Sequence, residues 1–154
     1  MAIFEGSFAT PAGRFALVAA RFNGFIVQSL VDGAGEALMR HGVREEDIDL
    51  VRVPGSFELP VVAQKLASSR QYAAVICLGA IIRGDTDHYD HVAGSTVSGI
   101  ASAAMSTGIP VIFGVLTCDT VEQAINRAGV KAGNKGFESA MAAIEMANLM
   151  AKLP

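Results

Sequence analysis

Residues 73–88 read AAVICLGAIIRGDTDH, and this stretch decides the fold of the chain. Its first ten residues are apolar, as is typical of a parallel strand that is covered on both faces of its sheet. The polar residues that follow, with Gly84 among them, predict a loop directly after the strand. A helical pattern begins near His88. The stretch therefore predicts a strand, a short loop and a helix in that order.

The same alternation continues on both sides of this stretch. Strands are predicted at 15–20, 48–53, 73–82 and 110–117, and helices at 24–41, 57–69, 88–106, 120–127 and 135–151. Strand followed by helix, repeated, predicts an α/β fold. We expect a three-layer α/β/α sandwich of flavodoxin-like type, with a four-stranded parallel sheet and right-handed crossovers. No linker, repeat or low-complexity stretch interrupts the pattern, so residues 1–154 are expected to form one domain.

Short polar and glycine signals mark the expected helix ends. Ser56 is predicted to cap the second helix, and Asp119 with Glu122 is predicted to form a capping box before the fourth. Gly42 and Gly108 stand where C-terminal caps are expected.

Composition and charge narrow the class of function. The chain is 51% hydrophobic with a net charge of -3 and scattered Lys and Arg, so a nucleic-acid-binding face is not expected. No apolar run approaches the roughly 20 residues that a membrane-spanning helix needs, and residues 1–10 lack the pattern of a secretory signal. Cys77 and Cys118 lie in apolar runs, so both are expected to be buried. They form no paired-cysteine motif, which fits a reducing cytoplasm best. The mean hydropathy of +0.41 predicts further burial between subunits of a homo-oligomer.

Polar and aromatic residues concentrate where the predicted strands end. In an open parallel sheet, ligands bind beyond the carboxyl ends of the strands, so the segments that follow them form the candidate site. These segments are 21–23, 54–58, 83–88 and 117–119. The sequence therefore predicts a pocket for a small molecule at this edge of the sheet.

The loop before His88 is a candidate anion site. The backbone amides at the start of a helix and the positive end of its dipole attract phosphate, and Thr86 can add a hydroxyl donor. Asp85 and Asp87 would oppose an anion unless their side chains point away, and a cation such as Arg127 would have to complete the site. A plain loop with acidic N-terminal caps would have a similar sequence.

Two histidines, His88 and His91, are three residues apart and share one face of the expected helix. With Asp85, Asp87 and Asp90 they could hold a divalent metal, but helical zinc sites more often use histidines four residues apart and a distant third ligand. No metal is therefore predicted. Imidazole accepts and donates protons near neutral pH, and His88 is the preferred proton-transfer residue because it is expected at the face where the strands end. His91 is expected to lie one turn deeper in a structural role, and a non-catalytic His88 is the alternative.

Other side chains after the strands are candidate ligand contacts. Phe22 directly follows the first strand and could stack on a flat heterocycle, whereas aromatic residues in such folds are usually core. Glu58 could accept hydrogen bonds from polyol hydroxyls, or be an ordinary acid in the first turn of a helix. Lys135 is a candidate cation, although the glycine-rich run 131–136 lacks the spacing of a nucleotide-binding P-loop.

Together these motifs resemble those of the lumazine synthase family over nearly the whole chain. They occur in the order and spacing of that family as RFN at 21–23, PGSFELP at 54–60, GAIIRGDTDHY at 79–89, GVLT at 114–117, QA at 123–124 with Arg127, and GNKGFE at 133–138.

The resemblance implies an enzyme of riboflavin biosynthesis. The family condenses 5-amino-6-(ribitylamino)pyrimidine-2,4-dione with 3,4-dihydroxy-2-butanone 4-phosphate to give 6,7-dimethyl-8-ribityllumazine, phosphate and water, which is the penultimate step of the pathway. This transferase-type condensation has no redox step, so no cofactor is implied. The enzyme must orient two small molecules and move several protons.

The resemblance also implies roles for individual residues. Asp85 and Thr86 would bind phosphate chiefly through backbone amides, with the Thr86 hydroxyl added. Arg127 would take the phosphate charge, Lys135 would support the anionic region, and His88 would shuttle protons. Contacts with the pyrimidine and its ribityl chain would come from Phe22, Asn23, Ser56, Phe57, Glu58, Ile82 and Phe113, with Phe22 stacked on the ring.

In this family each site lies between two subunits, one of which supplies the region of Phe113, Arg127 and Lys135. Subunits form pentamers, and twelve pentamers can close into a sixty-subunit icosahedral capsid, which the short run 129–136 favours. The apolar segment 2–4 would add an edge strand to a neighbour's sheet. Riboflavin synthase is a candidate partner.

Two other classes of function stay open beside this enzyme. A flavin-binding, electron-carrying flavodoxin-like module would need a hydroxyl-rich phosphate loop after the first strand, where this chain has no Ser or Thr before Ser29. A catalytically inactive, shell-forming structural protein would assemble without turnover. The set of Phe22, His88 and Arg127 argues against that second alternative.

Overall fold

A computed structural model describes residues 1–131 and 133–154, and it confirms the predicted α/β fold. The four strands, β1 (Arg14–Ala20), β2 (Ile48–Val53), β3 (Tyr72–Ile82) and β4 (Val111–Cys118), form one parallel sheet in the order β2-β1-β3-β4. The helices of the described residues are α1 (Gly24–Arg40), α2 (Leu59–Ser68), α3 (His88–Thr107), α4 (Val121–Arg127) and α5 (Lys135–Met150), with short 3-10 turns at Glu45–Asp47 and Ser56–Glu58. Ala132, inside the glycine-rich run 129–136, lies outside the described residues.

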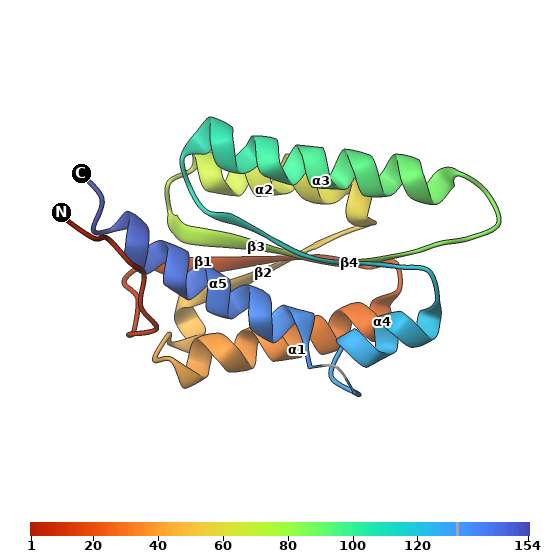
Figure 1. Cartoon of the computed structure of the whole chain (residues 1–154), viewed down its shortest axis with the longest axis horizontal. Helices are drawn as coiled ribbons and strands as arrows, with labels where there is room; N and C mark the ends of the chain where they lie inside the picture. The colour runs from red at the N-terminus through yellow and green to blue at the C-terminus, as the bar shows by residue number, and fades with distance from the viewer. Residues whose placement is uncertain (132) are drawn as a thin grey trace.

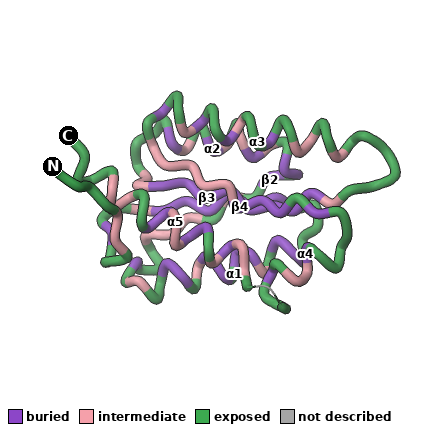
Figure 2. Tube along the Cα trace, viewed as in Figure 1, coloured by how far each residue is buried: buried purple, intermediate pink, exposed green. Residues whose placement is uncertain are grey.

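The helices cover both faces of the sheet. In Figure 1, α2 and α3 lie over one face, and α1, α4 and α5 lie over the other. Side chains alternate between faces along each strand, so Ile76 and Leu78 belong to the core under α1 and α5, whereas Val75 and Cys77 belong to the core under α2 and α3. The purple segments of Figure 2 gather along the strands. The central strands β1 and β3 are therefore buried almost throughout, and the ends of the sheet are where polar groups can face a ligand.

Close contact between α1 and α5 positions the start of α5. A Cβ on Gly136 would collide with the backbone carbonyl of Leu30, so only glycine allows this approach. Asn134 caps α5 by accepting a hydrogen bond from the amide of Phe137 at 3.0 Å, and its side-chain nitrogen donates to the carbonyl of Ser29 at 2.9 Å. The first turn of α5 is thus held against α1.

Two of the predicted helix caps are wrong, and two are confirmed. Asp119 does not cap α4, because its side chain accepts a hydrogen bond from Arg83; Thr120 caps instead, accepting from the amide of Gln123 at 3.1 Å. Gly108, at a φ of 70°, ends α3, and Gly42, at a φ of 90°, follows α1.

Ser56 is the second wrong cap. It lies buried inside the 3-10 turn that precedes α2, so its side chain does not close the helix start. The turn is closed by the Glu58 carboxylate, which accepts a hydrogen bond from the amide of Gly55 at 3.0 Å.

The N-terminal residues 1–13, all of them described, contain no helix or strand and lie beside α5. Asn148 on α5 donates hydrogen bonds to the carbonyls of Ser7 at 2.7 Å and Ala9 at 2.9 Å. Ile3 and Phe4 are exposed, at 69% and 50% of their surface. The addition of this segment to a neighbour's sheet stays a prediction.

Both cysteines are free and buried, as their apolar surroundings predicted. Burial raises the pKa of the Cys77 thiol to about 12 and also raises that of Cys118. Neither thiol is therefore suited to act as a nucleophile.

In the described ranges, no helix is both long enough and apolar enough to cross a membrane.

Candidate active site at the carboxyl edge of the sheet

Backbone hydrogen bonds join the loops that leave the strands. The amide of Arg21, after β1, donates to the carbonyl of Val53 at the end of β2 over 2.8 Å, and the amide of Phe22 donates to Pro54 over 3.0 Å. The amide of Arg83, after β3, donates to the carbonyl of Cys118 at the end of β4 over 2.9 Å. The loops are therefore fixed to one another where a ligand site is expected.

A cavity of about 400 Å³ opens between the loop after β1, the turn after β2 and the first turns of α3. Its walls are made by Phe22, Gly55, Ser56, Phe57, Glu58, His88, His91 and Val92. Phe22 and Phe57 are 69% and 60% exposed, although both are large aromatic residues. Aromatic rings left open beside polar groups are typical of a surface that receives a ligand or a partner.

A smaller cavity of about 150 Å³ adjoins this one through the shared residues Phe22, Ser56, His88 and Val92. It is lined in addition by Asn23, Ala80, Ile81, Ile82 and Tyr89. Asn23 has a left-handed backbone, with a φ of 57°, and its side-chain nitrogen donates to the carbonyl of Ala80 at 2.8 Å. It therefore ties the loop after β1 to β3 while it lines the cavity.

Helix α3 positions the polar end of the site. His88 is its first residue and is exposed, and its backbone amide donates to the Thr86 hydroxyl oxygen at 3.3 Å. Asp85 and Thr86 are exposed in the loop before it, which projects beyond the sheet in Figure 1. On the inner side of α3, the buried Thr96 hydroxyl contacts the carbonyl of Ser56 at 3.2 Å and links the helix to the turn after β2.

His91 is not the deeper, structural residue that the sequence predicted. Its side chain is 77% exposed, and its Nε2 atom lies 3.3 Å from a carboxylate oxygen of Asp87. Val92 and Ala93, the next residues of the same turn, are partly buried against the core, whereas His91 lies on the outer side of α3. The spacing of three residues from His88 does place His91 on the wall of the same cavity, which is the signal that could have identified it.

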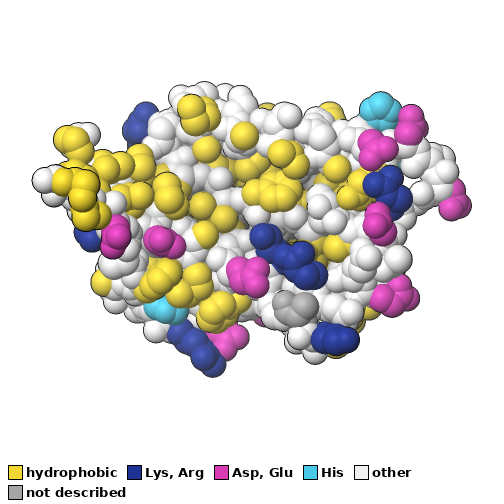
Figure 3. Space-filling model, in the orientation of Figure 1, with side chains coloured by type: hydrophobic (Ala, Val, Ile, Leu, Met, Phe, Trp, Pro, Cys, Tyr) yellow, Lys and Arg dark blue, Asp and Glu magenta, His cyan; other side chains and the backbone are white. Residues whose placement is uncertain are grey.

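Three residues of the predicted site lie elsewhere. Phe113 is half-buried in the middle of the edge strand β4, Arg127 is exposed at the end of α4, and Lys135 begins α5. In the described part of this single chain, none of the three lines either cavity, and neither do Asp85 and Thr86 of the loop before α3. Figure 3 shows apolar side chains gathered over the edge of β4, between the two helical layers.

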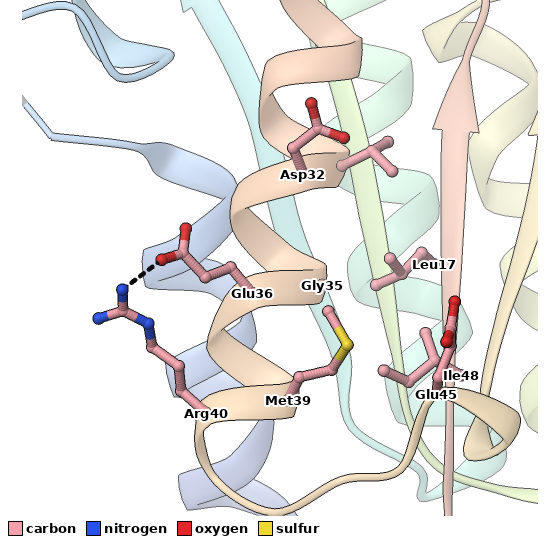
Figure 4. Close-up of a pocket in the computed structure, with 9 residues that line it drawn as sticks. Leu17, Asp32, Gly35, Glu36, Met39, Arg40, Glu45 and Ile48 are labelled. Carbon is pink, nitrogen blue, oxygen red and sulfur yellow. Dashed lines mark ion pairs between the residues drawn. The ribbon is translucent and has the colours of Figure 1, made fainter.

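A larger hollow of about 660 Å³ lies beside α1 and the first residue of β2, Ile48 (Figure 4). Its position is at the amino end of β2, opposite the edge where a ligand is expected. Its charged residues include the ion pair between Glu36 and Arg40, with N and O atoms 2.7 Å apart. None of the predicted site residues lines it, so the cavity at the carboxyl edge is the candidate site despite its smaller volume.

Across residues 1–131 and 133–154, no group of three or more His, Cys, Asp or Glu side chains is placed to hold a metal ion. The groups that face the two cavities are two histidines, a carboxylate, a serine, an asparagine and aromatic rings. These groups can stack on a ring, accept or donate hydrogen bonds and transfer protons.

The fold and the site define the class: an α/β protein with a parallel sheet and a small-molecule cavity at the carboxyl ends of its strands. Residues 12–151 match the family described as 6,7-dimethyl-8-ribityllumazine synthase. The chain belongs to this family. Family membership supports lumazine synthase activity in riboflavin biosynthesis, and it disfavours the flavin-carrying alternative.

Proposed function

We propose that this chain condenses 5-amino-6-(ribitylamino)pyrimidine-2,4-dione with 3,4-dihydroxy-2-butanone 4-phosphate to form 6,7-dimethyl-8-ribityllumazine. The observation that carries the proposal is the cavity of about 400 Å³ in which Phe22, Phe57, Glu58 and His88 meet, in a chain that matches the family over residues 12–151. The cavity combines a surface for a flat ring with acceptors for hydroxyl groups and a proton-transfer group.

The pyrimidine ring stacks on Phe22, whose exposed face borders both cavities. Ser56, Phe57 and Glu58 follow the ring and the ribityl chain. Since one oxygen of the Glu58 carboxylate accepts from the Gly55 amide, the carboxylate is oriented in advance and can accept from ribityl hydroxyls as well. Asn23 and Ile82 line the inner end of this substrate's site.

The phosphate of the second substrate binds at the loop before α3. The backbone amides of Asp85 and Thr86 face the phosphate, the Thr86 hydroxyl adds a donor, and the dipole of α3 favours the negative charge. The carboxylate of Asp85 is exposed and can face solvent while its amide points toward the ligand. Arg127 and Lys135, from a neighbouring subunit, neutralise the remaining charge.

His88 carries protons through the reaction. The primary amine of the pyrimidine attacks the ketone, and loss of water gives an imine. Phosphate leaves by elimination, the ribitylamino nitrogen closes the ring, and a second water is lost. Each step moves a proton between nitrogen, carbon and oxygen, so one imidazole beside both substrates serves several steps. The enzyme needs no redox cofactor or metal for these bonds.

The complete site forms between subunits of a homo-oligomer. The absence of Phe113, Arg127 and Lys135 from the cavities of the described single chain supports this part of the proposal, as does the apolar edge of β4. Pentamers use the segment 2–4 as an added strand, and twelve of them close into a sixty-subunit shell that can associate with riboflavin synthase. We place the enzyme in the cytoplasm.

The test is an assay of the purified protein with both substrates and a metal chelator, following the absorbance and fluorescence of the lumazine product. Turnover that survives chelation, and falls in a His88→Ala variant of equal assembly, is the expected result. Assembled, folded protein that yields no product would contradict the enzyme and favour the inactive shell protein.

A further inference from the structure

Arg83 is held from two sides although it lies in an exposed segment. Its Nε atom donates to a carboxylate oxygen of Asp119, after β4, at 3.0 Å, and a terminal nitrogen lies 3.6 Å from Asp90 on α3. The guanidinium carbon lies 4.3 Å above the centre of the Tyr89 ring. The backbone amide of Arg83 donates to the carbonyl of Cys118 at 2.9 Å. One side chain thus joins the end of β4 to the first turn of α3.

These contacts close the loop of residues 84–87 at its base. Arg83 is the residue before the loop, and Tyr89 and Asp90 stand in the helical turn after it. The loop itself is exposed throughout, so it has no core contact that would hold its backbone. The guanidinium therefore links the residues on the two sides of this loop.

Arg83 does not line either cavity in the described residues, and its charge already faces two carboxylates. The position of Arg83 therefore does not favour a direct contact with a ligand. Tyr89, whose ring lies beneath the guanidinium, does line the smaller cavity of about 150 Å³. Its contacts instead allow Arg83 to orient the residues around it.

We propose that Arg83 is a positioning residue that holds the 84–87 loop in the conformation that binds the phosphate of the second substrate. This inference rests on the proposed function of the loop. Exposed ion pairs add little to the stability of a fold, because solvent screens them. A loop that is fixed before binding loses less entropy when the ligand arrives, so the effect falls on affinity.

The experiment varies one substrate at a time at saturating levels of the other. Arg83→Met keeps the length of the side chain and removes the charge, and we expect it to raise KM for the butanone phosphate about tenfold while KM for the pyrimidine changes less than about twofold. Arg83→Lys restores the positive charge and should therefore recover part of this loss. The recovery should be incomplete, because an ammonium cannot stack on Tyr89 and bond both carboxylates as a planar guanidinium does.

Asp119→Asn tests the carboxylate that accepts the hydrogen bond from Arg83, and Arg44→Met is the matched control. Asp119→Asn alone should raise the same KM about threefold, and the double variant Arg83→Met/Asp119→Asn should be no worse than Arg83→Met. Arg44 is likewise exposed and paired, with Glu46 and Asp47 at the other edge of the sheet, so Arg44→Met should leave both KM values unchanged. Equal rises in both KM values, or additive effects in the double variant, would overturn the inference.

Binding of inorganic phosphate, measured by calorimetry, separates this inference from the proposed function. If the wild-type protein binds phosphate and Arg83→Met weakens that binding, the positioning role holds even where turnover is absent. If the wild-type protein is active and Arg83→Met binds phosphate equally well, the enzyme stands and the role of Arg83 is wrong. Unchanged melting temperature and assembly size in the variants confirm that the fold is intact.

Discussion

The two edges of the parallel sheet use similar polar residues in different ways. At the amino edge, Arg14 donates to the carboxylate of Asp49 at 2.8 Å, and the Tyr72 hydroxyl donates to the same oxygen at 2.7 Å. At the carboxyl edge, Glu58 and His88 border a cavity of about 400 Å³. Polar groups that satisfy one another stabilise a structure, whereas polar groups that face a cavity are available to a ligand. Substitutions at the two edges should therefore change different properties.

The largest effect is expected at the carboxyl edge, for His88→Ala. Loss of the proton-transfer group should slow turnover about 100-fold and leave both KM values close to normal. The melting temperature should not change, because His88 is exposed. Steady-state kinetics and thermal unfolding of the same preparation measure both effects. An unchanged rate would remove His88 from the mechanism.

A selective effect on one substrate is expected for Arg127→Ala. We expect KM for the butanone phosphate to rise at least about tenfold, because a guanidinium that pairs with phosphate oxygens is lost, while KM for the pyrimidine stays within about twofold. Arg44→Ala, which removes a guanidinium at the opposite edge, is the control. Equal losses for both substrates would contradict a phosphate role for Arg127.

At the amino edge, Tyr72→Phe should change stability and leave catalysis intact. The substitution removes one hydrogen bond to a partly exposed carboxylate, so the free energy of unfolding should fall by about 1 kcal/mol. Urea unfolding at a fixed protein concentration measures it, since assembly makes stability depend on concentration. A fall in kcat/KM without a fall in stability would break the distinction between the edges.

The contacts of Asp49 with Arg14 and Tyr72 also predict how stability depends on pH. Hydrogen bonds from Arg14, and then from Tyr72, lower the pKa of Asp49 in the folded protein. The resulting stabilisation is present above the unfolded pKa of about 3.9 and is lost as the pH falls through the lower, folded value. Asp49→Asn should therefore be less stable than the wild type at pH 7, and the difference should shrink as the solution is acidified. If the difference in the free energy of unfolding instead grew on acidification, the hydrogen bonds of Asp49 would not be its source.

The smallest effect is expected for His91→Gln. His91 lines the cavity, but its Nε2 atom lies 3.3 Å from the Asp87 carboxylate and its side chain is 77% exposed. We expect turnover to stay within about threefold of the wild type. A loss as large as that of His88→Ala would make His91 the catalytic base and sharpen the boundary of the site.

Most of the fold could be predicted because its signals are local. The apolar run that forms β3 and the helical pattern from His88 onward lie within a few residues of one another, and the observed bounds differ from the expected ones by a residue or two. Cap residues were harder to predict. Asp119 has the right chemistry for a cap, but its carboxylate is engaged by Arg83, 36 positions away in the chain.

Part of the site followed from the same local rules. Segments after parallel strands must meet at one edge, so Phe22, Glu58 and His88 could be expected to lie together, and they line one cavity. The exposure of His91 could not be foreseen, because it depends on which side of α3 packs against the core, where Val92 and Ala93 lie. Phe113, Arg127 and Lys135 are not brought to the cavity by the described chain, and their role stays a proposal.

Periodicity, apolar runs and motif order thus sufficed for the fold class, the family resemblance and the edge at which a ligand is expected, since each depends on residues close together in the chain. The pairing of polar groups was decided by the folded structure. Arg14 meets Asp49 across 35 positions and Arg83 meets Asp119 across 36, and both contacts exist because the sheet takes the order β2-β1-β3-β4. That order sets which strand ends are neighbours, and therefore which charges stabilise the protein and which remain facing the cavity.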